Sequence, residues 1–165
     1  PEGAPITLHV FVDHPCVGCG ALAPDLERLR RGFGDELQVV YRAYPLAIHP
    51  SAVRAAEARL ATFDAGGETA HAAYLAALRT APPSLDDAAL VALAAAVDPA
   101  LEAPVAAALA DGRFRGRVGA DRREAERLGL RVTPSFVVGR AVLPYGAGFR
   151  ELEEAADLAF EDAKP

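Results

Sequence analysis

The chain has two cysteines, Cys16 and Cys19, and only Val17 and Gly18 separate them. An apolar, β-branched run, ITLHVFV, comes before the pair, and leucines at helical spacing come after it. This order predicts a strand over Ile6–Val12, a short turn, and a helix that begins near Cys16 and runs to about residue 31. Two cysteines are too few for a disulfide scaffold. The pair is therefore a redox couple, half of a metal site, or two buried thiols that lie close together.

The rest of the pattern predicts an α/β chain of one domain. Its elements follow the order β-α-β, then a helical block, then α-β-β-α. We expect further strands over 37–44, 132–139 and 141–145, and further helices over 51–65, 68–79, 82–97, 101–109, 117–130 and 149–160. Ser51 is expected to cap the first helix of the block, and Gly66-Gly67 to end it. The expected core is 1–50 with 113–165, and the expected insertion is 51–112.

Charge and hydropathy exclude two classes of partner. The net charge is −6 and the arginines are scattered, so a nucleic-acid surface is not expected. No apolar run reaches the roughly 20 residues that a membrane-spanning helix needs. No signal peptide is visible at the start, which favours the cytoplasm. Removal of a leader would instead place the chain in the cell envelope.

Several motifs resemble the DsbA-like thiol:disulfide oxidoreductases of the thioredoxin superfamily. Pro24 stands five residues after Cys19, where thioredoxins carry the proline that kinks their active-site helix. VTPSFVVG is similar to the cis-proline loop of the family, with Pro134 as the cis residue. YPLAIHPSAVRAAEA is similar to the matching stretch of the DsbA branch, as is Asp13 three residues before Cys16. The resemblance covers nearly the whole chain.

The resemblance implies a thioredoxin fold with an inserted all-helical subdomain. Cys16 would be the nucleophile, because a helix N-terminus favours a thiolate, and Cys19 would be the resolving thiol. Thr133 and Pro134 would form the substrate-binding loop. The Cys16–Cys19 disulfide would be the redox group, with no metal or organic cofactor. The implied partners are protein substrates that contain thiols or disulfides, and an unidentified redox partner.

Four residues near the cysteines are candidate modulators. Val17 and Gly18 offer only backbone amides, unlike the Cys-Pro-His-Cys of strong oxidants, so we expect a potential between roughly −270 and −120 mV. Asp13 is expected to bond to backbone in the turn, with a proton-transfer role as the alternative. His14 is expected to be a solvated turn residue, with thiolate modulation as the alternative.

Other interpretations stay open at this stage. A mild disulfide reductase would use the same fold. A thiol-based metal-binding module is a rival of another class, although zinc needs four ligands and the chain has no second Cys-x-x-Cys. His49 and His71 are expected to be structural.

Overall fold

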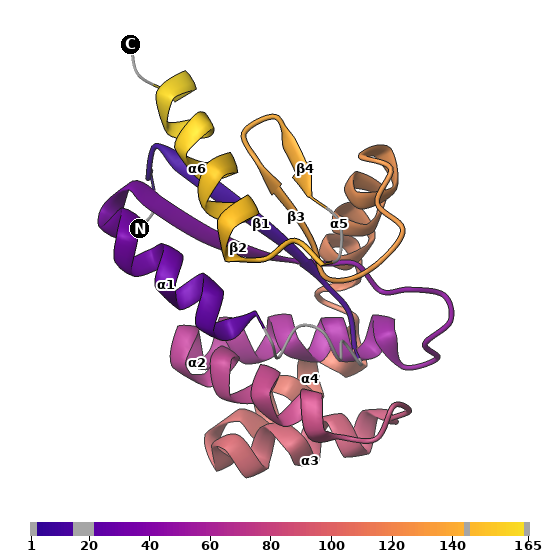
Figure 1. Ribbon diagram of the computed structural model, residues 1–165. Coiled ribbons are helices and arrows are strands. Elements are labelled where there is room, and N and C mark those ends of the chain that lie inside the picture. The colour runs from indigo at the N-terminus through magenta and orange to yellow at the C-terminus, as the bar shows by residue number, and fades with distance from the viewer. Residues whose placement is uncertain (1–2, 15–21, 144–145, 164–165) are drawn as a thin grey trace. The chain divides into compact units, whose positions relative to one another are not determined.

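The computed structural model of the protein describes residues 3–14, 22–143 and 146–163 (Figure 1). The elements, in chain order, are β1 Ile6–Val12, α1 Ala23–Phe33, η2 Gly34–Glu36, β2 Leu37–Ala43, α2 Ala52–Thr80, α3 Asp87–Val97, η3 Pro99–Leu101, α4 Glu102–Asp111, α5 Arg115–Arg127, β3 Ser135–Val138, β4 Ala141–Leu143 and α6 Phe149–Ala163. They form a mixed α/β fold, as the sequence predicts. None of the helices in the described ranges is both long enough and apolar enough to span a membrane.

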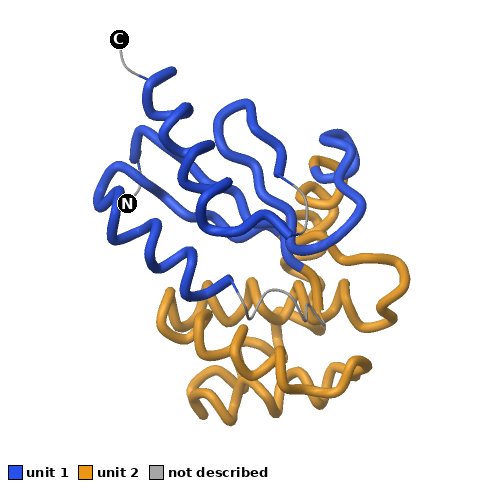
Figure 2. Tube along the Cα trace, in the orientation of Figure 1, with its two compact units in different colours: residues 1–12, 16–42, 125–165 blue, residues 13–15, 43–124 orange. Residues whose placement is uncertain are grey.

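The chain divides into two compact units (Figure 2). Unit 1 comprises residues 1–12, 16–42 and 125–165, and unit 2 comprises 13–15 and 43–124. The helical unit is wider than the expected insertion of 51–112. It also takes in the chain that follows β2 and most of α5.

Unit 1 is built on a four-stranded sheet with the order β2-β1-β3-β4. β3 runs antiparallel to both β1 and β4. Ile6, Leu8 and Val10 on β1 are almost wholly buried, and α6 packs on β1, β3 and β4. Phe11, on the other face of the strand, is also buried, which agrees with a strand covered on both faces.

Helix α1 contains two of the leucines whose spacing predicts a helix, Leu26 and Leu29. Its first residue is Ala23, and the expected start near Cys16 lies outside the described residues. Pro24 is therefore in the first turn of α1, where its missing N–H removes no helical hydrogen bond. The expected kink at Pro24 stays a prediction, because the helical residues expected before it lie outside the described part of the chain. Leu26 and Leu29 face the core of the unit, which they share with Leu152 on α6.

Unit 2 has its own apolar core between α2, α3 and α4, with the buried ring of Tyr74 at its centre. Helix α2 is kinked at Gly67, whose backbone has φ 68° and ψ −162°. Only glycine adopts this conformation readily, which explains why the sequence predicts two helices here. A side chain at Gly66 would meet the Cβ atom of Ala70 at 2.5 Å, so this position is also restricted to glycine.

The side-chain cap expected at Ser51 is not formed. Ser51 is the N-cap residue of α2, but its side chain makes no capping hydrogen bond. Its hydroxyl instead donates to the carbonyl oxygen of Pro83 at 3.2 Å. The side-chain cap of this region belongs to α3, where Asp86 accepts from the N–H of Ala89 at 2.8 Å. The tertiary partner of Ser51 replaced the local one.

Candidate functional site

The four residues Cys16, Val17, Gly18 and Cys19 lie outside the described part of the chain. The structure describes the residues that lead into this segment, the helix α1 that follows it, and the loop with Thr133 and Pro134.

The β1–β3 register places the Pro134 loop beside the end of β1. Phe11 is paired with Ser135, the residue that follows Pro134. Paired residues of antiparallel strands lie about 5 Å apart, so Pro134 is close to the point at which the chain leaves β1 for the cysteines. The Thr133–Pro134 peptide bond is cis, in agreement with the expectation.

A side-chain hydrogen bond shapes this loop. The hydroxyl of Ser135 donates to the carbonyl oxygen of Val132 at 2.7 Å, so it closes a turn around Thr133 and Pro134. Pro134 is buried and Thr133 half-buried. Val132 exposes 43% of its surface, which gives the loop an apolar side chain in contact with solvent.

Asp13, the first residue after β1, has a wholly buried carboxylate. Its Oδ1 atom accepts from the N–H of His14 at 2.6 Å, and its Oδ2 atom accepts from the N–H of Leu46 at 3.0 Å. The expectation of a turn residue that bonds to backbone is therefore confirmed. Burial raises the pKa of the Asp13 carboxyl, while its hydrogen bonds, above all the one to His49, act to lower it.

His49 is the side-chain partner of Asp13, and this pairing is not predicted from the sequence. Its Nδ1 atom lies 2.5 Å from Oδ2 of Asp13, and 24% of its side chain is exposed to solvent. The sequence predicts a structural role for His49, and its contact with a buried carboxylate is consistent with that role. A signal was present, because His49 follows β2 and Asp13 follows β1, which is the neighbouring strand of the sheet.

His14 differs from the expected solvated turn residue. Only 5% of its surface is exposed, and its Nε2 atom lies 3.4 Å from the carbonyl oxygen of Pro82. Burial lowers the pKa of the His14 ring, because the charged form loses its hydration. His14 is therefore mainly uncharged at neutral pH, which weakens its case as an electrostatic modulator.

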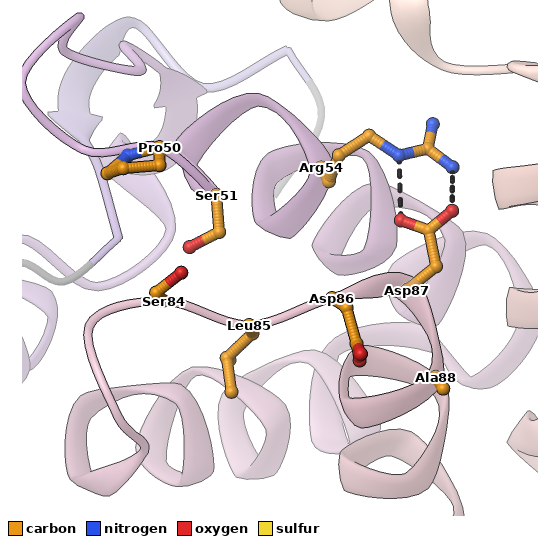
Figure 3. A pocket seen from close by; sticks show the side chains of 8 residues that line it. All are labelled: Pro50, Ser51, Arg54, Ser84, Leu85, Asp86, Asp87 and Ala88. Atoms are coloured by element: carbon orange, nitrogen blue, oxygen red, sulfur yellow. Dashed lines mark hydrogen bonds and ion pairs between the residues drawn. The ribbon is translucent and has the colours of Figure 1, made fainter.

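A separate pocket of about 500 Å³ lies in unit 2 (Figure 3). It is lined by Pro50, Ser51, Arg54, Ser84, Leu85, Asp86, Asp87 and Ala88. Arg54 is the cation of this pocket, but its guanidinium makes two hydrogen bonds to the carboxylate of Asp87. Since this cation is already neutralised, we assign the pocket no anionic ligand.

Within the described ranges, no group of three or more histidine, aspartate, glutamate or cysteine side chains could hold a metal ion. Asp13 and His49 are a pair and do not form such a group.

A comparison with protein-family models matches residues 1–157 to a family described as Thioredoxin. The chain belongs to the thioredoxin family. A search of the curated proteins found no significant match. The family assignment agrees with the sheet, the helical unit and the cis-proline loop described above.

Solved structures share the fold over almost the whole of this thioredoxin-family chain. A thioredoxin-like oxidoreductase from Silicibacter pomeroyi is 24% identical, with a TM-score of 0.74 over 96% of this chain and 88% of that one. The thiol-disulfide exchange protein alpha-DsbA2 from Wolbachia pipientis is 17% identical, with a TM-score of 0.77 over 96% and 83%. The catalytic domain of Proteus mirabilis ScsC is 20% identical, with a TM-score of 0.76 over 98% and 86%. This thioredoxin-family fold is therefore of the DsbA type, with a helical unit added to the sheet.

Proposed function

We propose that this chain is a thiol:disulfide oxidoreductase that exchanges a Cys16–Cys19 disulfide with the thiols of protein or peptide substrates. The observation that carries the proposal is the β1–β3 register. It brings the cis-Pro134 loop beside the end of β1, from which the chain enters the Cys-x-x-Cys segment. Membership of the thioredoxin family supports it.

The proposed reaction needs no cofactor, because the disulfide carries the electrons. A substrate thiolate attacks the Cys16 sulfur, the Cys16–Cys19 bond breaks, and Cys19 leaves as a thiolate. A second substrate thiolate then attacks the substrate sulfur of the mixed disulfide, and Cys16 leaves. The substrate has gained a disulfide and lost two electrons, which the Cys16–Cys19 dithiol holds. A redox partner with a disulfide of its own would accept these electrons and restore the enzyme.

The loop with Thr133 and Pro134 is the proposed substrate-binding element. Proline has no N–H, so this position cannot extend the β-ladder toward β1. The N–H and C=O groups of Thr133 are then the backbone groups that can pair with an extended peptide. The exposed side chain of Val132 next to them would contact apolar residues of that peptide.

The roles of the cysteines can be tested by trapping. Cys19→Ser should accumulate mixed disulfides with a model substrate that contains a disulfide, because the Cys16 thiolate attacks that disulfide and the thiol that would release the product is gone. Cys16→Ser should accumulate few. Non-reducing electrophoresis and mass spectrometry of the linked peptides measure both variants. Trapping by Cys16→Ser alone would reverse the roles, and no exchange by the wild type would overturn the proposed function.

The direction of exchange depends on the reduction potential. We expect the Cys16–Cys19 couple to lie between the thioredoxin and DsbA values, roughly −270 to −120 mV, since Val17 and Gly18 supply no side-chain donor. Equilibration with glutathione measures it. A value near the thioredoxin end would favour a disulfide reductase. Stoichiometric zinc in native mass spectra of the reduced chain would favour the metal-binding rival.

A further inference from the structure

The four-stranded sheet of unit 1 has two edges, and they differ in length. β4 forms one edge with three residues, and β2 forms the other with seven. β2 is bonded to β1 on one side, and no strand of the described chain lies on its other side. A long edge strand offers a row of backbone N–H and C=O groups to another strand. The free edge of β2 is therefore a surface on which a further strand can pair.

The sequence of β2, LQVVYRA, favours such pairing. β-branched and aromatic residues, which suit a sheet, occupy the middle of the strand, and their side chains are half-buried. Edge strands usually carry lysine or proline residues that hinder association, and β2 contains neither. Its one charged residue is Arg42, near the end of the strand. A partner of β2 should therefore place a negative charge opposite Arg42.

The backbone contact of Ala43 limits where a partner strand can pair. The N–H of Ala43 donates to Oδ2 of Asp121 at 3.0 Å, so it is not bonded to β1. Backbone groups of alternate residues point to the same side of a strand, so those of Val39 also point to the free edge. Since the N–H of Ala43 is already engaged, a partner strand has to pair with the residues before it.

β2 of a second copy of this chain meets both conditions in one register. Edge strands related by a twofold axis run antiparallel, so the register is defined by the residue that lies opposite itself. With Val39 at the axis, the exposed Glu36 lies opposite Arg42, and the symmetry forms this pair twice. With Val40 at the axis, Arg42 has no acid opposite it, and Ala43 would have to give up its hydrogen bond to the carboxylate.

We propose that β2 pairs with β2 of a second copy of this chain, antiparallel and centred on Val39, so that the two sheets join into one. In this register Leu37 also lies opposite Tyr41, and both side chains are on the face that packs on the core of unit 1. Cross-strand pairs of opposite charge and of apolar side chains stabilise antiparallel sheets. This interface does not depend on the proposed function.

The oligomeric state tests the proposal directly. A single pair of strands is smaller than a standard stable interface, so the dimer should be weak. Sedimentation of the wild type, from low concentration up to about 1 mM, should show a mass that rises from that of the monomer toward that of the dimer. A reductant in the buffer prevents intermolecular disulfides. A monomer over the whole range would overturn the proposal.

Charge variants test the register. Glu36→Arg should weaken the dimer about tenfold, because a like charge then lies opposite Arg42 at both ends of the interface. Addition of Arg42→Glu should restore the affinity to within about threefold of the wild type, because opposite charges face each other again. The matched control is Asp35→Arg, which makes the same change of net charge at an exposed neighbour. The control should not weaken the dimer, and equal losses in Glu36→Arg and Asp35→Arg would overturn the proposal.

Hydrogen exchange of the wild type shows which edge is covered. When a concentrated sample is compared with a dilute one, amide protection should rise in the peptide over 37–43 and stay unchanged in β4, the other edge of the sheet. This measurement needs no variant, so it decides the matter even if Arg42→Glu fails to fold. A dimer whose protection rises elsewhere and not in β2 would overturn the proposal.

Discussion

Gly139, at the residue scale, is constrained both by its backbone and by its neighbour. It turns the chain between β3 and β4 with φ 54°, a conformation that side chains rarely adopt. A Cβ atom at this position would lie 2.9 Å from Cβ and 3.5 Å from Cα of Ala159 on α6. The glycine therefore permits both the tight turn and the close approach of α6 to the hairpin.

Gly139→Ala should lower the free energy of unfolding by about 2–4 kcal/mol, from the strained φ and the overlap with α6 together. Gly129→Ala is the matched control. Gly129 has φ 74°, but nothing lies within 4 Å of an added Cβ, so this variant should lose only about 1 kcal/mol. Urea unfolding followed by circular dichroism measures both, and equal losses would show that the contact with Ala159 is unimportant.

At the scale of elements, Arg54 joins three helices of unit 2. From α2 it donates to Asp87 on α3 and to the carbonyl oxygen of Leu109 on α4 at 2.8 Å. It also donates to Glu57, one turn along α2, at 2.6 Å. Glu57 is 1% exposed, so Arg54 neutralises a charge that has almost no contact with water.

Arg54→Met should destabilise the protein by about 3–5 kcal/mol, because it leaves the Glu57 carboxylate buried without its main partner. Asp87→Asn breaks the other ion pair of the same arginine, but 53% of the Asp87 side chain is exposed. Its loss should therefore cost about 1 kcal/mol or less. Thermal and urea unfolding of the two variants give the comparison. A larger loss for Asp87→Asn would mean that the α2–α3 bridge, and not the buried charge, matters most.

At the scale of the whole molecule, the free energy of unfolding should depend on pH in part through the titration of His71. Its Nε2 atom lies 2.9 Å from Nη1 of Arg59, and 8% of the residue is exposed. Burial, together with the positive charge of Arg59, lowers the pKa of His71 to about 4. The unfolded chain, with a histidine pKa near 6.5, then binds a proton that the folded chain does not.

The contribution of His71 to the free energy of unfolding is fully present above pH 6.5, where the ring is uncharged in both states. It is lost as the pH falls toward 4, because protonation then favours the unfolded chain. We expect the His71 contribution to shrink by about 3 kcal/mol between pH 7 and pH 4. His71→Gln can still accept from Arg59 but cannot titrate, so its stability should fall less steeply with acid. Urea unfolding of both proteins at several pH values tests this. Parallel pH profiles would show that His71 does not carry the effect.

Local chemistry explains what the sequence by itself determined. Apolar residues at both odd and even positions made β1 predictable. The predicted bounds, Ile6–Val12, are those that the structure has. Gly66-Gly67 marked the kink in α2, because a positive φ is a local property of glycine. The cis bond at Pro134 followed from a motif in adjacent residues. The Cys-x-x-Cys segment itself stays a prediction, since its residues lie outside the described ranges.

The tertiary structure decided which polar side chains meet and which are buried. Ser51 was expected to cap its helix, but its hydroxyl donates to the carbonyl oxygen of Pro83, which lies in another segment. His14 was expected in solvent, but the fold covers it. The pairing of Asp13 with His49 joins residues 36 positions apart, after two neighbouring strands of the sheet. Turn propensity and periodicity act over a few residues, whereas burial and long-range hydrogen bonds exist only once the strands have paired.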